Sequence, residues 1–289
     1  MDGGEVLMRL RIVHTTTHTY DGDVVASFNE ARMTPLTTPH QTTLDARLEI
    51  SPTATVTPYW DYWGTHVTAF DLHARHDRLV TTATSLVETD RGRGRGGTAH
   101  RSLSWDDLGG DDVTDTLAEF LAPTPRTTAP ADGFADQVRD LVAGADPREA
   151  AHRICSWVHD AVEYVPGATG VHATAEESWV LRRGVCQDLA HLALAGLRTV
   201  GVPARYVSGY LHPRRAPEVG QEVAGESHAW IDFFDGAWTG WDPTNDIAVG
   251  DRHVVVARAR DYSDVSPLQG VYSGPRSTVD ARVLVTRVA

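Results

Sequence analysis

One stretch of the sequence holds a cysteine at the expected start of a helix: Arg183-Gly184-Val185-Cys186-Gln187-Asp188-Leu189-Ala190-His191. Small and apolar residues continue from it at spacings of three and four, at Leu189, Leu192, Ala193 and Gly196-Leu197, which predicts a helix that begins close to Cys186. The free N–H groups and the dipole of a helix N-terminus stabilise an anion, and the thiolate is the nucleophilic form of cysteine. We therefore predict that Cys186 is a reactive thiol and that Gly184 lets a backbone or a substrate approach it closely.

Two later segments supply the partners that such a thiol needs. Glu226 to Phe234 is rich in aromatic and β-branched residues, and Ala237 to Asp242 is a shorter run that Pro243 ends. We predict two strands, joined by a turn at Asp235-Gly236. In this arrangement His228 would take the proton of Cys186 and later return it to a leaving group, while Asp242 would fix the tautomer of the imidazole.

The length of that turn decides whether His228 and Asp242 can meet, because side chains alternate between the two faces of a strand. A two-residue turn would pair Phe234 with Ala237. The side chains of His228 and Asp242 would then lie on opposite faces. A loop of residues 234–236 would instead pair Phe233 with Ala237 and place His228 directly opposite Asp242. We therefore predict the longer loop, Gly236 at positive φ, a bulge at this corner and a hydrogen bond between Asp242 and His228.

Four motifs occur in order along the second half of the chain: Gly184-Val185-Cys186-Gln187-Asp188, Gly201-Val202-Pro203-Ala204-Arg205-Tyr206-Val207-Ser208-Gly209-Tyr210, His228-Ala229-Trp230 and Trp241-Asp242-Pro243-Thr244. Together they resemble the transglutaminase-like superfamily, and most closely its bacterial branch described as cysteine proteases. The resemblance implies a papain-like α+β core in which Cys186, His228 and Asp242 form a catalytic triad. The N-terminal third resembles the β-rich region that precedes this core in the bacterial branch.

A triad of this kind implies an acyl-transfer enzyme that attacks a peptide or carboxamide carbonyl and forms a thioester. If water resolves the thioester, the protein is a protease or amidase, and if an amine does, it is a transglutaminase. The resemblance to the bacterial branch favours hydrolysis. The oxyanion needs donors, for which we expect the backbone N–H of Cys186, with Trp179 or Tyr164 as candidate side-chain donors. The alternative is a non-enzymatic protein-binding module with the same fold.

Composition limits the partners of the protein. The chain has 289 residues, a hydrophobic fraction of 41% and a net charge of −13, which argues against nucleic acid and anionic membrane and leaves a peptide or protein substrate. All 26 basic residues are arginine. No apolar run is long enough for a signal peptide or a membrane span, so we expect a soluble, cytoplasmic protein. The sequence points to no cofactor and to no particular oligomeric state.

The two cysteines are expected to differ in role. They do not make a disulfide framework. Cys155 lies with Ile154 and Val158 on the apolar stripe of a predicted helix, so we expect a buried structural thiol. A zinc site built from Cys186, His228 and Asp242 would lack a fourth ligand and a close pair of Cys or His residues, so no metal is predicted.

The order of predicted elements gives the domain organisation. Short alternating segments, interrupted by Gly and Pro, predict β structure for residues 9–88, and the repeat Arg91 to Gly97 predicts a flexible loop. Helical patterns follow from Asp112, and strands follow the Cys186 helix, with a loop at Pro213 to Gly225 that could gate the cleft. We therefore expect an α+β protein. Its predicted parts are a β-rich N-terminal domain (1–88), a flexible Arg/Gly linker or loop (89–110) and a catalytic domain with a papain-like transglutaminase core of helices plus antiparallel sheet (111–289).

Overall fold

The N-terminal region is built from strands. The structure is a computed structural model that describes residues 7–90 and 102–289. Along β6 buried and less buried residues alternate, as expected for a strand with one face covered. The prediction of a β-rich N-terminal region is confirmed. Its strands are β1 (Leu7–Val24), β2 (Ala26–Ala31), β3 (Gln41–Ser51), β4 (Thr55–Trp60), β5 (His66–Leu72) and β6 (His76–Asp90).

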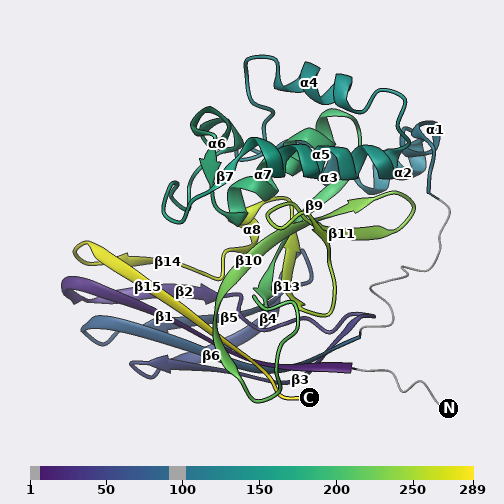
Figure 1. Cartoon of the computed structure of the whole chain (residues 1–289). Helices are drawn as coiled ribbons and strands as arrows, with labels where there is room; N and C mark the ends of the chain where they lie inside the picture. Colours follow the sequence, from purple (N-terminus) through teal and green to yellow (C-terminus); the bar gives the residue numbers. More distant parts are fainter. Residues whose placement is uncertain (1–6, 91–101) are drawn as a thin grey trace, which may run out of the picture.

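The helices come next along the chain and then give way to strands again. The helices are α1 (Trp105–Leu108), α2 (Asp111–Thr116), α3 (Ala118–Leu121), α4 (Phe134–Leu141), α5 (Pro147–Ala161), α6 (Ala175–Leu181), α7 (Cys186–Thr199) and α8 (Tyr262–Val265). The remaining strands are β7 (Glu163–Tyr164), β8 (Arg183–Gly184), β9 (Ala204–Leu211), β10 (Glu222–Phe234), β11 (Trp238–Asp242), β12 (Ile247–Ala248), β13 (His253–Ala259), β14 (Leu268–Ser273) and β15 (Ser277–Arg287). Figure 1 shows the helices gathered at one end of the molecule and the N-terminal strands at the other.

A long antiparallel sheet connects the two ends. Its strands follow the order β12-β11-β10-β15-β1-β6-β3, and β9 and β13 branch from β10. A second sheet, in the order β14-β2-β5-β4, combines N-terminal strands with one from the C-terminal part of the chain. The α+β fold with antiparallel sheets is thus as predicted, and strands from both ends of the chain build each of the two larger sheets.

Strand β10 links the N-terminal strands to the helical end. Its first residues, Glu222 to Gly225, pair with β15, whereas Glu226 to Phe233 pair with β9. The prediction of a loop as far as Gly225 was wrong at Glu222 to Gly225, because their partner strand lies some sixty residues later and leaves no local trace in the sequence. Residues 91–101 of the predicted linker lie outside the described residues, and Trp105–Leu108 of the same segment forms helix α1.

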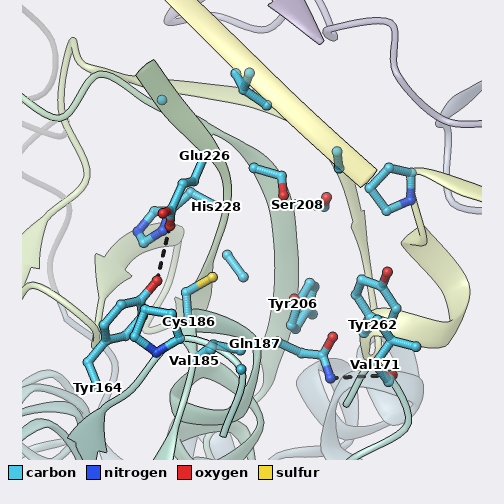
Figure 2. Close-up of a pocket in the computed structure, with 18 residues that line it drawn as sticks. Tyr164, Val171, Val185, Cys186, Gln187, Tyr206, Ser208, Glu226, His228 and Tyr262 are labelled. Carbon is cyan, nitrogen blue, oxygen red and sulfur yellow. Dashed lines mark hydrogen bonds between the residues drawn. The ribbon is translucent and has the colours of Figure 1, made fainter. Parts of the chain in front are cut away.

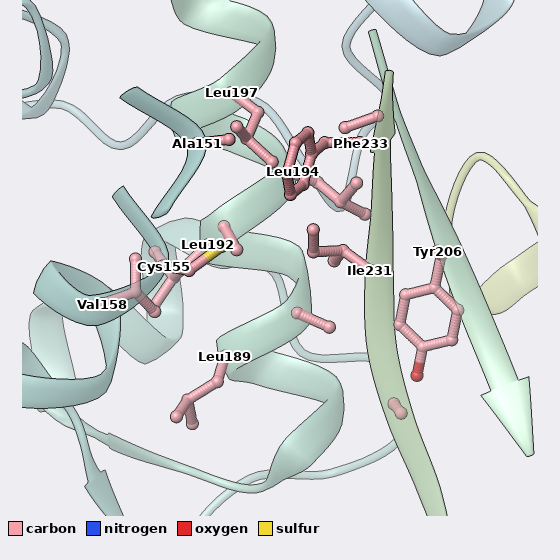
Figure 3. Packing of buried hydrophobic residues seen from close by; sticks show 14 of the residues in the cluster. Ala151, Cys155, Val158, Leu189, Leu192, Leu194, Leu197, Tyr206, Ile231 and Phe233 are labelled. Carbon is pink, nitrogen blue, oxygen red and sulfur yellow. The ribbon is translucent and has the colours of Figure 1, made fainter. Parts of the chain in front are cut away.

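Helix α7 is the centre of the main core. Every residue from Gln187 to Arg198 is buried. Figure 3 shows its leucines between the α5 residues Cys155 and Val158 on one side and the β10 residues Ile231 and Phe233 on the other. A helix enclosed in this way is fixed in position, because a close-packed core resists displacement. The first residue of α7, Cys186, is therefore held rigidly relative to β10. Within the described residues, no helix is long and apolar enough to cross a membrane.

Candidate active site

Cys186 is the first residue of helix α7, as the sequence predicts. Val185 caps the helix in an extended conformation, and its N–H donates to Asp188 Oδ2 at 2.8 Å. Gly184 permits this arrangement, because a Cβ at that position would lie 2.7 Å from Asp188 Cβ. In the described part of the chain the backbone N–H of Cys186 donates to no other group, so it remains open to a ligand.

The hairpin brings His228 and Asp242 to one face, but in a different register from the predicted one. Phe234 pairs with Trp238, so the loop comprises Asp235, Gly236 and Ala237 instead of residues 234–236. In this register Asp242 lies opposite Trp230. Because His228 is two residues from Trp230 along β10, the side chains of His228 and Asp242 lie on the same face of the sheet. The loop length, the positive φ of Gly236 (110°) and the bond between His228 and Asp242 are as predicted.

Two parts of the hairpin prediction were wrong: the pairing of Phe233 with Ala237, and the bulge, since the pairing of β10 with β11 runs without a shift. The physical reason lies in the residues at the corner. The rings of Phe234 and Trp238 pack edge to face with centroids 5.5 Å apart, which extends the ladder by one pair. Asp235 is fully buried and ion-paired with Arg148, which holds it in the loop.

The Asp242 carboxylate is fully buried and accepts hydrogen bonds on both oxygens. Its Oδ2 accepts from His228 Nε2 at 2.8 Å, from Asn245 Nδ2 at 2.7 Å and from His253 Nε2 at 3.3 Å. Its Oδ1 accepts from the backbone N–H groups of Thr244 and Asn245. Because so many donors converge on it, this carboxylate is held both in position and in its charged form.

These contacts shift the pKa values of His228 and Asp242. Burial by itself would lower the pKa of His228, but its hydrogen bonds with Asp242 and Cys186, together with their charges, raise that pKa to about 10. Burial would likewise raise the pKa of Asp242, but the hydrogen bonds from His228 and His253 hold it far below its usual range. Since Nε2 of His228 is bonded to Asp242, Nδ1 is the nitrogen left for Cys186. The structure therefore places Cys186 and His228 in one cleft, with His228 hydrogen-bonded to Asp242 through its other ring nitrogen.

Cys186 opens into a cleft with a volume of about 380 Å³. Figure 2 shows its sulfur between the side chains of Tyr164, His228 and Tyr206. Tyr164 lines the cleft and donates a hydrogen bond to Glu226 at 3.1 Å. Trp179, the other candidate oxyanion donor, is 5% exposed, packs on Phe134 and does not line this cleft. Of the two candidates, only Tyr164 is brought to the thiol.

Three residues of the site were missed by sequence reasoning. Tyr206 on β9 lines the cleft, and its hydroxyl makes no hydrogen bond within the described residues. Burial, and then the nearby charge of Cys186, raise the pKa of Tyr206 well above its ordinary value. Asn245 and His253 both bind Asp242. Asn245 could have been found, because it follows the Asp-Pro-Thr turn directly. Tyr206 and His253 come from strands that only the fold brings to the site.

The ligand atoms of His228, Asp242 and His253 lie within 4.8 Å of one another and so resemble a metal-binding group. They do not fit a resident ion. His253 Nδ1 accepts the backbone N–H of Gly250 at 3.1 Å, so its Nε2 carries the proton and donates to Asp242. A metal ligand would need a lone pair at that nitrogen. Hydrogen bonding alone accounts for the cluster.

A helix that presents a cysteine at its first turn, packed on an antiparallel sheet that presents a histidine and an aspartate, defines an α+β protein with a transglutaminase-like core. Comparison with known families agrees. Residues 10–88 match the bacterial transglutaminase-like N-terminal region, and residues 135–243 match the transglutaminase-like superfamily. The chain belongs to the transglutaminase-like superfamily.

Related proteins extend over the whole chain. An uncharacterized protein of Mycobacterium leprae is 42% identical over 98% of this chain and 100% of its own length. An uncharacterized protein of Mycobacterium tuberculosis is 30% identical over 95% of this chain and 91% of its own. Among solved structures, a candidate cysteine protease from Cytophaga hutchinsonii superimposes with a TM-score of 0.77 and 20% identity, covering 98% of this chain and 91% of that one. That likeness shows the fold, including the N-terminal strands, and not the reaction.

Proposed function

We propose that the protein is a cysteine-dependent acyl-transfer enzyme that acts on peptide or carboxamide bonds through Cys186, His228 and Asp242. The observation that carries the proposal is that Cys186 and His228 line one cleft and that His228 is hydrogen-bonded to the buried Asp242 carboxylate. A cysteine at a helix start, paired with a histidine that a carboxylate orients, is the arrangement that activates a thiol for attack on a carbonyl.

The reaction would proceed in two steps. The Cys186 thiolate attacks the carbonyl carbon, and His228 donates its Nδ1 proton to the leaving amine or ammonia, which leaves a thioester on the sulfur. His228 then accepts a proton from the incoming water or amine as that group attacks the thioester, and the C–S bond breaks to release the acid or new amide and restore the Cys186 thiolate. Asp242 stays ionised throughout and stabilises the imidazolium. Its burial and its set of donors suit this role, because they keep the carboxylate from reorienting during the proton transfers.

The oxyanion would bind at the start of α7. The N–H of Cys186, which has no acceptor among the described residues, supplies one donor. The second donor that we propose is the Tyr206 hydroxyl, which lines the cleft and is not engaged elsewhere in the described chain. Tyr164 is less suited, since its hydroxyl proton is directed at Glu226. A Tyr206→Phe variant should lower kcat by about 10² while leaving KM nearly unchanged.

Hydrolysis is favoured over transfer in this proposal. The Cys186 side chain is partly exposed in a cleft that opens to solvent, so water can reach a thioester formed there. A transglutaminase would instead have to exclude water from the acyl-enzyme. The amine route remains the alternative outcome of the experiment below.

The deciding experiment incubates the purified protein with a library of peptides containing glutamine, with and without an added primary amine, and analyses the products by mass spectrometry. A hydrolase yields free acids whether or not the amine is present, and a transglutaminase yields amine adducts. Because the chain contains no lysine, the protein offers no side-chain amine of its own as a competing acceptor. No product in either condition, with the wild type indistinguishable from Cys186→Ala, would favour the binding-module alternative.

A further inference from the structure

The charge of the cleft is set by one residue. Among the described residues that line it, Glu226 is the only carboxylate, and no arginine is present. The positive charge of His228 is balanced by the Asp242 carboxylate to which it is hydrogen-bonded. The cleft therefore carries a single uncompensated negative charge at neutral pH.

Glu226 is placed to act on whatever binds beside the thiol. It precedes His228 by two residues on β10, so the two side chains leave the same face of the strand, about 7 Å apart along it. Tyr164 reaches across from β7 and donates to Glu226 Oε2 at 3.1 Å. Figure 2 shows this bond beside the sulfur of Cys186.

The other oxygen of Glu226 is available to a ligand. Within the described residues, Oε1 of Glu226 accepts no hydrogen bond, and the residue is exposed. Tyr164 thus limits the rotation of the carboxylate and, among the described residues, leaves its second oxygen as a free acceptor on a residue that lines the cleft. A cation that binds there gains a charge-assisted hydrogen bond and the attraction of an unpaired charge.

We propose that Glu226 makes this cleft select a cationic side chain, arginine or lysine, next to the carbonyl that Cys186 attacks. The proposal rests on the proposed function for the carbonyl, but its electrostatic part can be tested without turnover. The net charge of −13 acts in the same direction, because it attracts cationic peptides from solution.

The first test measures how fast three methanethiosulfonates of different charge modify Cys186. The reagents carry an aminoethyl group (cationic), a methyl group (neutral) and a sulfonatoethyl group (anionic). In each case the thiolate displaces a sulfinate and forms a mixed disulfide, so the three reactions differ chiefly in the charge brought into the cleft. The modified peptide is identified by mass spectrometry, which separates Cys186 from the buried Cys155.

The rates are compared between the wild type, Glu226→Gln and a matched control, Glu222→Gln. Glu222 is an exposed glutamate on the same strand, outside the cleft, so it controls for the loss of one charge from the molecule. At low salt the wild type and Glu222→Gln should modify about tenfold faster with the cationic than with the anionic reagent. In Glu226→Gln the ratio should fall several-fold, with the neutral reagent unchanged. An equal ratio in all three proteins would overturn the proposal.

The second test assigns the selected cation to a side chain. N-acetylated glutamine peptides carry either arginine or its neutral isostere citrulline beside the glutamine, so no terminal amine is present. The wild type should prefer arginine about tenfold in kcat/KM, and Glu226→Gln should turn over both peptides alike. Equal turnover by the wild type would overturn the selection while leaving the enzyme function intact. Preference for an unacetylated citrulline peptide would assign the cation to the terminal amine and overturn the side-chain proposal.

The two tests distinguish cation selection by Glu226 from the proposed acyl-transfer function. If no peptide is turned over but the reagent ratio still depends on Glu226, the proposed function fails and Glu226 remains a cation-selecting residue of a binding cleft. If peptides are turned over and the ratio is independent of Glu226, the enzyme function stands and the selectivity is refuted.

Discussion

His253 donates to the same oxygen of Asp242 that His228 contacts. The two nitrogen atoms lie 3.3 Å and 2.8 Å from Asp242 Oδ2. The N–H of Gly250 fixes His253 as a neutral donor, and burial lowers the pKa of His253 in spite of its hydrogen bond with Asp242. A neutral donor stabilises the carboxylate without competing for the role of imidazolium. His253 is thus a positioning residue for Asp242.

Replacement of His253 by phenylalanine tests that relationship. The change removes one donor from buried Asp242 and leaves the Gly250 N–H without its acceptor, so we expect the free energy of unfolding to fall by about 1–3 kcal/mol. The pKa of Asp242 should rise, and the acid limb of the Cys186 alkylation profile should move to higher pH. A loss of stability in urea denaturation with an unmoved acid limb would show that His253 is only structural.

Substitutions in the triad should follow a definite order. Cys186→Ala should abolish turnover with the fold intact, because the side chain is partly exposed and small. His228→Ala should be nearly as severe, at about 10⁶-fold in kcat, and Asp242→Asn should be milder, at about 10⁴-fold. The asparagine still leaves His228 beside the sulfur, in the wrong tautomer for part of the time. Steady-state kinetics on any substrate found in the peptide screen gives the order, and activity in Cys186→Ala would contradict the proposed nucleophile.

The glycine before the nucleophile can be tested with a matched pair. A Cβ on Gly184 would lie 2.8 Å from Asp188 Oδ2, whereas a Cβ on Gly170 would meet nothing within 4 Å. Gly184→Ala should therefore displace Asp188, loosen the first turn of α7, lower stability by about 1–3 kcal/mol and slow the alkylation of Cys186. Gly170→Ala should change neither quantity. Equal effects of the two variants on denaturation and alkylation would argue against the close contact.

The second cysteine should matter only for stability. Cys155 is fully buried on α5, and burial, followed by the charges of Asp246 and Asp242, raises the pKa of its thiol. Cys155→Ser should retain activity and lose about 1–3 kcal/mol of stability, because a hydroxyl replaces a thiol in an apolar core. Thermal denaturation and turnover of the variant check both parts. Loss of activity in a folded Cys155→Ser protein would mean that the assignment of the nucleophile is incomplete.

The parts of the site that the sequence predicts are those encoded by neighbouring residues. The start of α7 at Cys186 follows from helical spacing, and the shared face of His228 and Asp242 follows from strand alternation. The register is off by one pair because the packing of Phe234 on Trp238, and not the turn chemistry alone, sets the loop.

The parts that could not be predicted depend on contacts between distant segments. His253 reaches Asp242 only because β13 pairs with β9, which itself pairs with β10. Tyr206 comes to the cleft through the same pairing of β9. Trp179 was a candidate donor on sequence grounds, but it belongs to an aromatic cluster with Phe134 and Trp157 in the helical core. Local pattern cannot distinguish a buried indole from one that lines a cleft.

The charged forms of His228 and Asp242 are each stabilised by the fold, and their shifted pKa values set the pH range in which both are charged. The pKa of His228 is raised from 6.5 to about 10, so the stabilisation from its charged form is complete below about pH 6.5 and is lost as the pH rises through about 10. The pKa of Asp242 is lowered, so the stabilisation from its carboxylate is present above its ordinary value of 3.8 and is lost as the pH falls below that value. Between these limits His228 is an imidazolium in the cleft that holds the sulfur of Cys186, and Asp242 is its ionised partner.

The measurement that tests this most directly is the pH dependence of alkylation of Cys186 by iodoacetamide, followed by peptide mapping, in the wild type and in His228→Ala. We predict that the wild type reacts rapidly at pH 6, well below the value of about 8.5 that governs a free thiol, while Cys155 in the same sample remains unmodified. In His228→Ala the rate should fall at pH 6 and recover only as the pH approaches that of an ordinary thiol. A wild-type profile that follows a free thiol, and that His228→Ala leaves unchanged, would contradict the pairing of Cys186 with His228.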